Sequence, residues 1–78
     1  MTPKILNIKL LDDYKIEIHY QSGEVKVFDF TKYLSYGRLS ELKDKNLFKE
    51  AYVSYDTIEW PDGIDIDPDT LYSKSISQ

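Results

Sequence analysis

The chain has 78 residues, a formal net charge of −4 and no cysteine, so we expect one small domain over residues 1–78 that neither disulfides nor thiolate-bound metals can stabilise. Its ten basic residues are scattered along the chain, which argues against a surface that tracks a nucleic-acid backbone. No apolar run approaches the ~20 residues that span a bilayer, and the N-terminus has no signal-peptide layout, so we expect a cytoplasmic protein that does not contact membranes.

Apolar and polar residues alternate along residues 4–30, and this period of two predicts an antiparallel meander of three strands. The first strand covers about residues 4–11 and ends in a turn at Asp12 and Asp13. The third covers residues 25–30. The second strand is the most clearly amphipathic, with its apolar side formed by Tyr14, Ile16, Ile18 and Tyr20.

Ser22 and Gly23 predict a two-residue hairpin loop between the second and third strands. With that loop, Tyr20 lies opposite Val25, and Ile18 lies opposite Val27. The same register places three residues on the other face of the third strand: Lys26, Phe28 and Phe30. A strand that is apolar on both faces is central or covered by a helix, so we expect this sheet to be covered on its second side.

The alternation stops after residue 30 and resumes at Tyr52. Leu39 and Leu42 stand three residues apart, which predicts one helical turn over about residues 38–43. Asp44 can cap a second short helix whose inner face carries Leu47, Phe48 and Ala51. Neither helix is long enough to persist without packing on the sheet.

A second hairpin is predicted from Tyr52 to Trp60, with its turn at Asp56 and Thr57. Val53 and Tyr55 share its inner side with Ile58 and Trp60. Pro61, Asp62 and Gly63 then form a turn, and Asp67 followed by Pro68 is typical of a helix N-terminus. We expect that helix to end near Ser73 and residues 74–78 to fray.

These elements predict an α+β domain. The expected architecture is a small antiparallel or mixed sheet, built from the three-strand meander and the second hairpin, with one or two short helices against one face and a C-terminal helical turn. We expect five strands in one sheet, in an order that the sequence leaves open.

Three segments carry a resemblance to a known family. The C-terminal run from Trp60 to Tyr72, the segment from Gly37 to Asp44 with Phe48, and the glycine-containing hairpin near the N-terminus resemble the bacterial family called domain of unknown function 2442. The resemblance covers about residues 4–72, although the turn between the last two strands is shorter than the family's. Its signature residues are Trp60, Pro61, Asp62, Gly63, Asp65, Pro68, Leu71 and Tyr72.

The resemblance implies a small α+β domain without established catalytic residues. Members of the family occur as stand-alone bacterial proteins, as domains fused to a helix-turn-helix, or beside a small partner in pairs that resemble toxin–antitoxin modules. We expect no second domain of that kind in this chain, so the resemblance does not imply DNA binding for it.

No constellation in the chain predicts a catalytic, cofactor or metal site. Asp65, Asp67 and Asp69 have the spacing that opens a calcium loop, but the positions that need glycine and glutamate hold Thr70 and Ile76. The aspartates are therefore interpreted as a turn and a helix cap. His19 has no histidine or cysteine neighbour in the sequence and is interpreted as a surface residue.

We therefore expect a non-catalytic protein-interaction module, the regulatory or antitoxin-like member of a small gene pair, whose partner is another small protein or a second copy. One alternative is a ligand-binding or enzymatic domain with a pocket near Trp60 to Asp65. A weak nucleic-acid-associated regulator is the other, and it is disfavoured because the aromatic residues are assigned to the core. Those placed on the inner side are Tyr14, Tyr20, Tyr55 and Trp60.

Overall fold

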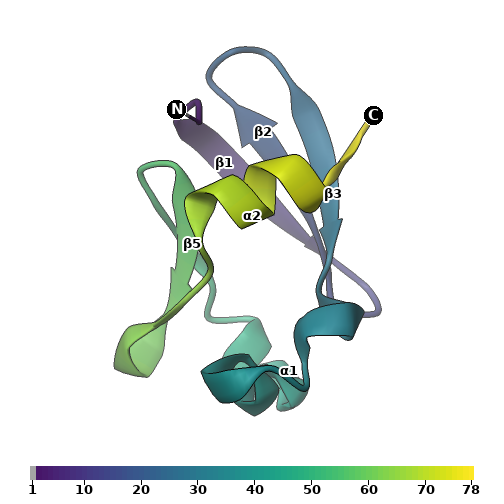
Figure 1. Cartoon of the computed structure of the whole chain (residues 1–78), viewed down its shortest axis with the longest axis vertical. Helices are drawn as coiled ribbons and strands as arrows, with labels where there is room; N and C mark the ends of the chain where they lie inside the picture. Colours follow the sequence, from purple (N-terminus) through teal and green to yellow (C-terminus); the bar gives the residue numbers. More distant parts are fainter. Residues whose placement is uncertain (1) are drawn as a thin grey trace.

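Two antiparallel sheets form the β structure in the computed structural model, which describes residues 2–78 (Figure 1). The first sheet has the order β1-β2-β3-β7, and its strands are Ile5–Leu11, Lys15–Tyr20, Val25–Asp29 and Ile76–Ser77. The second has the order β4-β5-β6, and its strands are Tyr52–Ser54, Thr57–Trp60 and Ile64–Asp65. With the short helices, this arrangement confirms the predicted α+β class.

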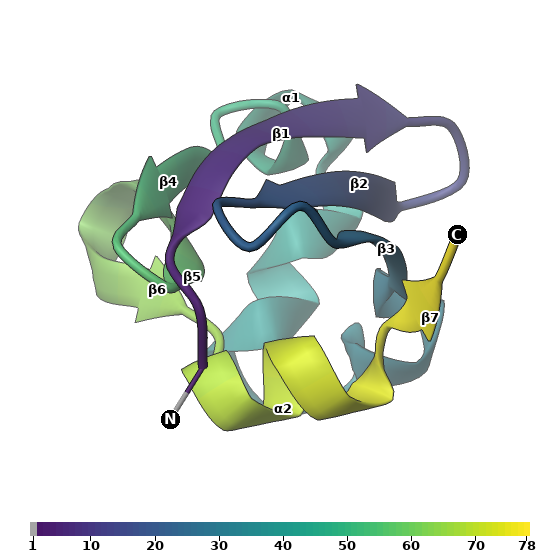
Figure 2. The same cartoon turned by 90° about the horizontal axis from the view of Figure 1, so that it is seen from above.

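The expectation of one five-stranded sheet is wrong, because β1 and β4 do not form a ladder. Within residues 2–78, one backbone hydrogen bond joins β1 to the second hairpin, from the amide of Ile5 to the carbonyl of Tyr55 at 2.7 Å. Beyond Ile5 the two strands diverge as β1 runs toward its C-terminal end (Figures 1 and 2).

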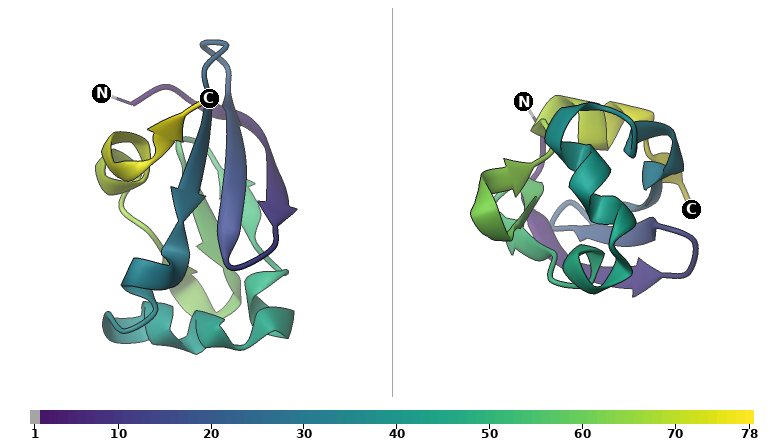
Figure 3. Two further views of the ribbon diagram at one scale, coloured as in Figure 1. Left: turned by 90° about the vertical axis from the view of Figure 1, so that its right-hand side faces the viewer. Right: turned by 90° about the horizontal axis from the view of Figure 1, so that it is seen from below.

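The helices close the two open sides of these sheets. Helix α2 (Pro68–Lys74) crosses the gap between β5 and β3, and both strands contact it (Figures 1 and 2). The 3₁₀ helix η2 (Gly37–Lys43) and helix α1 (Lys45–Phe48) cover the lower end of the strands (Figure 3). Two 3₁₀ turns, η1 (Phe30–Tyr33) and η3 (Pro61–Gly63), follow β3 and β5. The predicted short helices near residues 38–43, after Asp44 and from Pro68 are thus confirmed.

The β2–β3 hairpin has a three-residue loop, so the predicted two-residue loop is wrong. Tyr20 and Glu24 close the hairpin through a 2.9 Å amide–carbonyl bond, and Gly23 lies in the left-handed region at φ 96°. The extra loop residue moves the register by one, so Ile18 lies opposite Lys26 and His19 opposite Val25. A one-residue shift exchanges the two faces of a strand, and Phe28 therefore joins the core face of β2.

The core lies between the two sheets, helix α2, and the helices η2 and α1. Trp60, Phe28, Phe30 and Tyr20 are its largest buried side chains. Phe30 packs edge-to-face on Trp60, with ring centroids 5.4 Å apart, an arrangement that aromatic rings favour. The other buried apolar residues are Ile5, Ile16, Ile18, Leu34, Leu42, Phe48, Ile58, Ile64, Ile66 and Leu71.

Two further expectations are corrected at the ends of strands. The β4–β5 turn lies at Tyr55 and Asp56, because Ser54 pairs with Thr57. This turn leaves Tyr55 74% exposed rather than in the core. The C-terminal residues form β7 instead of fraying, since Ile76 pairs with Val27 and the amide of Gln78 donates to the carbonyl of Val25.

Candidate functional site

The signature residue Trp60 is a core residue that ties β5 to α1. Its indole is fully buried, and Nε1 donates a 2.9 Å hydrogen bond to the carbonyl of Phe48 at the end of α1. A buried indole N–H needs such a partner. Pro61 follows at the start of η3, where its fixed φ suits the turn.

The turn after Trp60 reverses the chain into β6. Asp62 and Gly63 both adopt left-handed backbone angles, φ 67° and 74°. Asp62 is a residue type that tolerates this region, and glycine is free of the steric cost. The carbonyl of Asp62 accepts a hydrogen bond from the Arg38 guanidinium of η2, so this turn is held against η2.

The rest of the signature fixes α2 in place. The carboxylate of Asp67 accepts the amide of Thr70 at 3.0 Å, and Pro68 occupies the first helical position. This confirms the predicted helix cap. Leu71 is fully buried beneath the helix.

Tyr72 anchors the C-terminal end of α2 to β3 through Lys26, which is only 7% exposed. The Lys26 ammonium donates to the carbonyl of Tyr72 at 2.6 Å and lies 3.9 Å from the centre of its ring. Both the helix C-terminus and the aromatic face favour a cation. The Tyr72 hydroxyl donates to Glu24 at 2.7 Å. A buried lysine is therefore accommodated by a helix end rather than by an acidic partner.

Two tyrosines near this anchor have raised pKa values. The hydrogen bond to Glu24 raises the pKa of Tyr72, and the same bond lowers the pKa of Glu24. Burial, with smaller contributions from Tyr72, Glu24 and Asp56, raises the pKa of Tyr20 to about 12. Within residues 2–78, the buried hydroxyl of Tyr20 has no hydrogen-bond partner among protein groups. The bond between Tyr72 and Glu24 links α2 to the start of β3.

The signature residues therefore do not assemble into an open pocket near Trp60 to Asp65. The Trp60 indole is closed off from solvent, whereas Asp62 and Asp65 are exposed on the surface over a filled core. Ile64 and Ile66, on either side of Asp65, are buried. The contacts described for Trp60, Pro61, Asp67, Pro68, Leu71 and Tyr72 are contacts within the fold.

The remaining candidates from the sequence are also accounted for locally. Nε2 of His19 lies 3.1 Å from a carboxylate oxygen of Glu17 on the partly exposed outer face of β2, as expected of a surface residue. Asp67 is committed to capping α2. Among residues 2–78, no group of three or more His, Asp or Glu side chains could hold a metal ion, and no helix is long and apolar enough to cross a membrane.

A different feature, the outer edge of β1, is open. In the β2–β3 ladder the amide of Tyr20 points toward β3. Because backbone groups alternate along a strand, the N–H and C=O groups of His19, Glu17 and Lys15 point toward β1. Their β1 partners Asn7, Lys9 and Leu11 use their backbone groups on β2. The N–H and C=O groups of Ile8 and Leu10 therefore point to the free edge. A β-bulge between Ile5 and Asn7 sets this parity.

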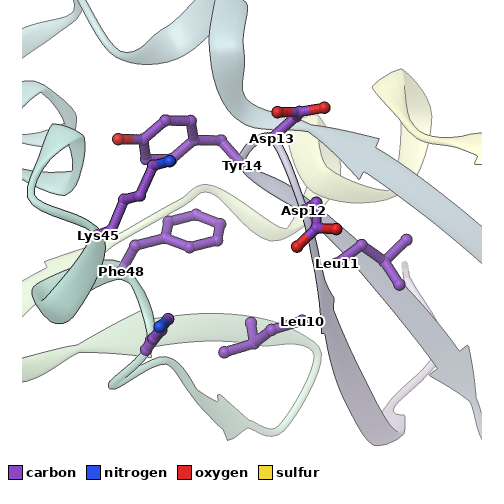
Figure 4. A pocket seen from close by; sticks show the side chains of 8 residues that line it. Leu10, Leu11, Asp12, Asp13, Tyr14, Lys45 and Phe48 are labelled. Carbon is purple, nitrogen blue, oxygen red and sulfur yellow. The ribbon is translucent and has the colours of Figure 1, made fainter.

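A cleft of about 480 Å³ opens between the C-terminal end of β1, the β1–β2 turn and α1. Figure 4 shows Leu10 and Phe48 on its apolar walls, with Tyr14 and Lys45 above them. Tyr14 packs edge-to-face on Phe48 at 5.3 Å, and its hydroxyl donates to the carbonyl of Lys43. The remaining lining residues are Leu11, Asp12, Asp13 and Lys49. We call the free edge of Ile8–Leu11 and this cleft the β1 groove.

The turn at the end of the β1 groove has unusual backbone geometry. Asp13 and Tyr14 both have left-handed angles, φ 61° and 60°. That region costs roughly 1–2 kcal/mol for a residue with a Cβ, and the packing of Tyr14 on Phe48 compensates for it. This geometry aims the Tyr14 ring at α1 and holds one wall of the cleft.

In the comparison with protein families, the model described as "Protein of unknown function (DUF2442)" matches residues 5–77. The chain belongs to this family. No curated protein and no solved structure matches the chain significantly. The family match confirms the resemblance predicted from the signature and leaves the activity of DUF2442 open.

In this DUF2442 member, the sequence pattern predicts the turn and the helix cap of the signature segment, but it does not predict the β1 groove. The pattern of β1 indicates an ordinary amphipathic strand, and whether its second edge is paired depends on where β4 lies. The available signal was the sequence Asp12-Asp13-Tyr14, which lacks the glycine that two-residue hairpin turns favour. It indicated an irregular turn but not the cleft beside it.

Proposed function

We propose that this domain is a non-catalytic protein-interaction module that binds a partner protein along the β1 groove. As a member of DUF2442, it would act as the regulatory or antitoxin-like component of a pair of small proteins. The observation that carries the proposal is the unpaired edge of β1 beside an apolar cleft. An open strand edge is a template for an added strand, and adjacent pockets give such binding its specificity.

The exposed surface supports the same location. Leu6, on the β-bulge of β1, is 62% exposed, and Tyr55 at the tip of the neighbouring hairpin is 74% exposed. Both lie at the N-terminal end of the β1 groove, and the ammonium of Lys4 lies 5.3 Å from the Tyr55 ring. Exposed apolar and aromatic side chains at one end of an open strand edge are compatible with a protein-binding surface.

A pair of proline variants tests the proposal. Leu10→Pro removes an N–H that points to the free edge, a position where strands tolerate proline, so we expect the fold to survive while strand addition is blocked. Leu11→Pro is the matched control on the next residue, because its N–H belongs to the β1–β2 ladder and its loss should destabilise the fold.

The assay is co-expression with the product of the neighbouring gene, followed by co-purification and size-exclusion chromatography. The proposal predicts a complex with the original chain and none with folded Leu10→Pro. A complex that folded Leu10→Pro still forms would place binding elsewhere. The absence of any complex with the original chain would also contradict the proposed function.

A further inference from the structure

The charges around the β1 groove indicate which kind of partner segment could bind there. Lys9 is the charged residue within β1, and its side chain lies on the exposed outer face of the sheet. Its cross-strand neighbour is Glu17, but the Glu17 carboxylate is bonded to His19 at 3.1 Å. Lys9 has no ion pair with any residue in the described range 2–78.

The far wall of the cleft is basic as well. Lys45 and Lys49 lie on α1 and at its end, and neither forms an ion pair within residues 2–78. The Lys45 ammonium instead lies 5.9 Å from the centre of the Tyr14 ring. The carboxylate of the adjacent Asp44 is used to cap α1 by accepting the amide of Asn46 at 3.0 Å. Three lysines, Lys9, Lys45 and Lys49, and two aspartates, Asp12 and Asp13, therefore surround the β1 groove, so positive charge is in excess there although the whole chain has a net charge of −4.

The geometry of a strand paired with β1 predicts which residue types the added strand should carry. On a strand added to β1, the residue opposite Lys9 lies on the outer face, and its two neighbours lie on the inner face beside Ile8 and Leu10. The inner positions meet the apolar walls formed by Leu10 and Phe48. The outer position meets an unpaired ammonium group.

We propose that the β1 groove accepts an extended segment of a partner protein in which an acidic residue is flanked by two apolar residues. The acidic residue pairs with Lys9, and the apolar side chains enter the cleft beside Leu10 and Phe48. This inference rests on the proposed function and specifies its partner. A second copy of β1 fits less well, because pairing about Lys9 would bring two lysines directly opposite each other.

The test uses the full ¹⁵N-labelled chain and two blocked peptides of about six residues, the usual strand length. In one peptide valine alternates with glutamate, and in the other valine alternates with lysine. The readouts are the dissociation constants and the hydrogen exchange of the Ile8 and Leu10 amides. We expect the glutamate peptide to bind and protect both amides, and the lysine peptide to bind at least about fivefold more weakly.

Charge reversal provides the second arm. Lys9→Glu should reverse the preference between the two peptides, whereas Lys32→Glu, the same change on exposed η1 beyond β3, should leave it unchanged. If both peptides protect Ile8 and Leu10 equally, the proposed edge binding stands and the acidic preference is overturned.

If neither peptide protects these two amides, the partner assignment is overturned, and the Leu10→Pro experiment decides the proposed function independently. Protection of Ile8 and Leu10 in the concentrated chain without peptide would also overturn the assignment, because a second copy would then occupy the edge.

Discussion

Replacing Trp60 by phenylalanine tests whether the signature stabilises the fold. The substitution removes the hydrogen bond to the Phe48 carbonyl, which contributes about 1 kcal/mol. That carbonyl keeps the amide of Ala51 at 3.3 Å as a donor, so the full penalty for an unpaired buried group does not apply. A side chain smaller by about 40 Å³ costs roughly 1 kcal/mol more at ~24 cal/mol per Å³.

We therefore expect Trp60→Phe to lower the free energy of unfolding by about 2 kcal/mol, a large share of the ~4–12 kcal/mol that a domain of this length has. The measurement is urea unfolding followed by far-UV circular dichroism, because the variant has lost the fluorophore. Tyr55→Phe, at an exposed position, is the control and should change the value by less than about 0.5 kcal/mol. A loss below about 0.5 kcal/mol for Trp60→Phe would refute the structural account of the signature.

Three further predictions concern stability. The pKa of Tyr20 is raised to about 12 in the folded state, so the stability that its neutral form provides below pH ~10 is lost as the pH rises toward 12. Tyr20→Phe removes this alkaline loss and, by deleting an unpartnered hydroxyl, gains about 1 kcal/mol at neutral pH; urea midpoints at pH ~7 and ~11 check both, and a loss at neutral pH would show that the hydroxyl is hydrogen-bonded. Asp67→Ala removes the α2 cap and should cost about 1 kcal/mol, or roughly 4–8 °C in melting temperature, whereas exposed Asp65→Ala should have little effect. Truncation after Ser75 removes β7 and should cost about 1 kcal/mol; an unchanged melting temperature would mean that the tail contributes nothing.

Local chemistry made the helices and the α2 cap predictable from sequence. Asp44 and Asp67 cap helices through their own side chains, and Pro68 has one conformation that suits a first turn. These features depend on residues within three or four positions of each other. The burial of Trp60 was predictable for a similar reason, because it shares the apolar side of β5 with Ile58.

The strand register and the sheet boundaries depend on geometry that the pattern does not contain. Both a two-residue and a three-residue loop suit Gln21 to Glu24, and the choice exchanges the faces of β3. The pattern places Lys26 on one face with Phe28 and Phe30 but does not show what stabilises a lysine there, which is the C-terminus of α2 and the Tyr72 ring. Tyr55 follows the inward side of the alternation, but the turn places it outside.

The β1 groove belongs to the same class of features. Its open edge results from the divergence of β1 and β4, which are about forty residues apart in the chain. No local signal reports such a long-range relation. The unpaired lysines around the groove are visible in the sequence, but they become a binding pattern only when the strand is placed beside α1.

Amide hydrogen exchange along β1 of the free protein tests the central claim most directly. An open outer edge predicts fast exchange at Ile8 and Leu10 and slow exchange at Asn7, Lys9 and Leu11, whose amides bond to β2. Equal protection of all five amides would mean that the edge is already paired, and the β1 groove could not receive a partner strand.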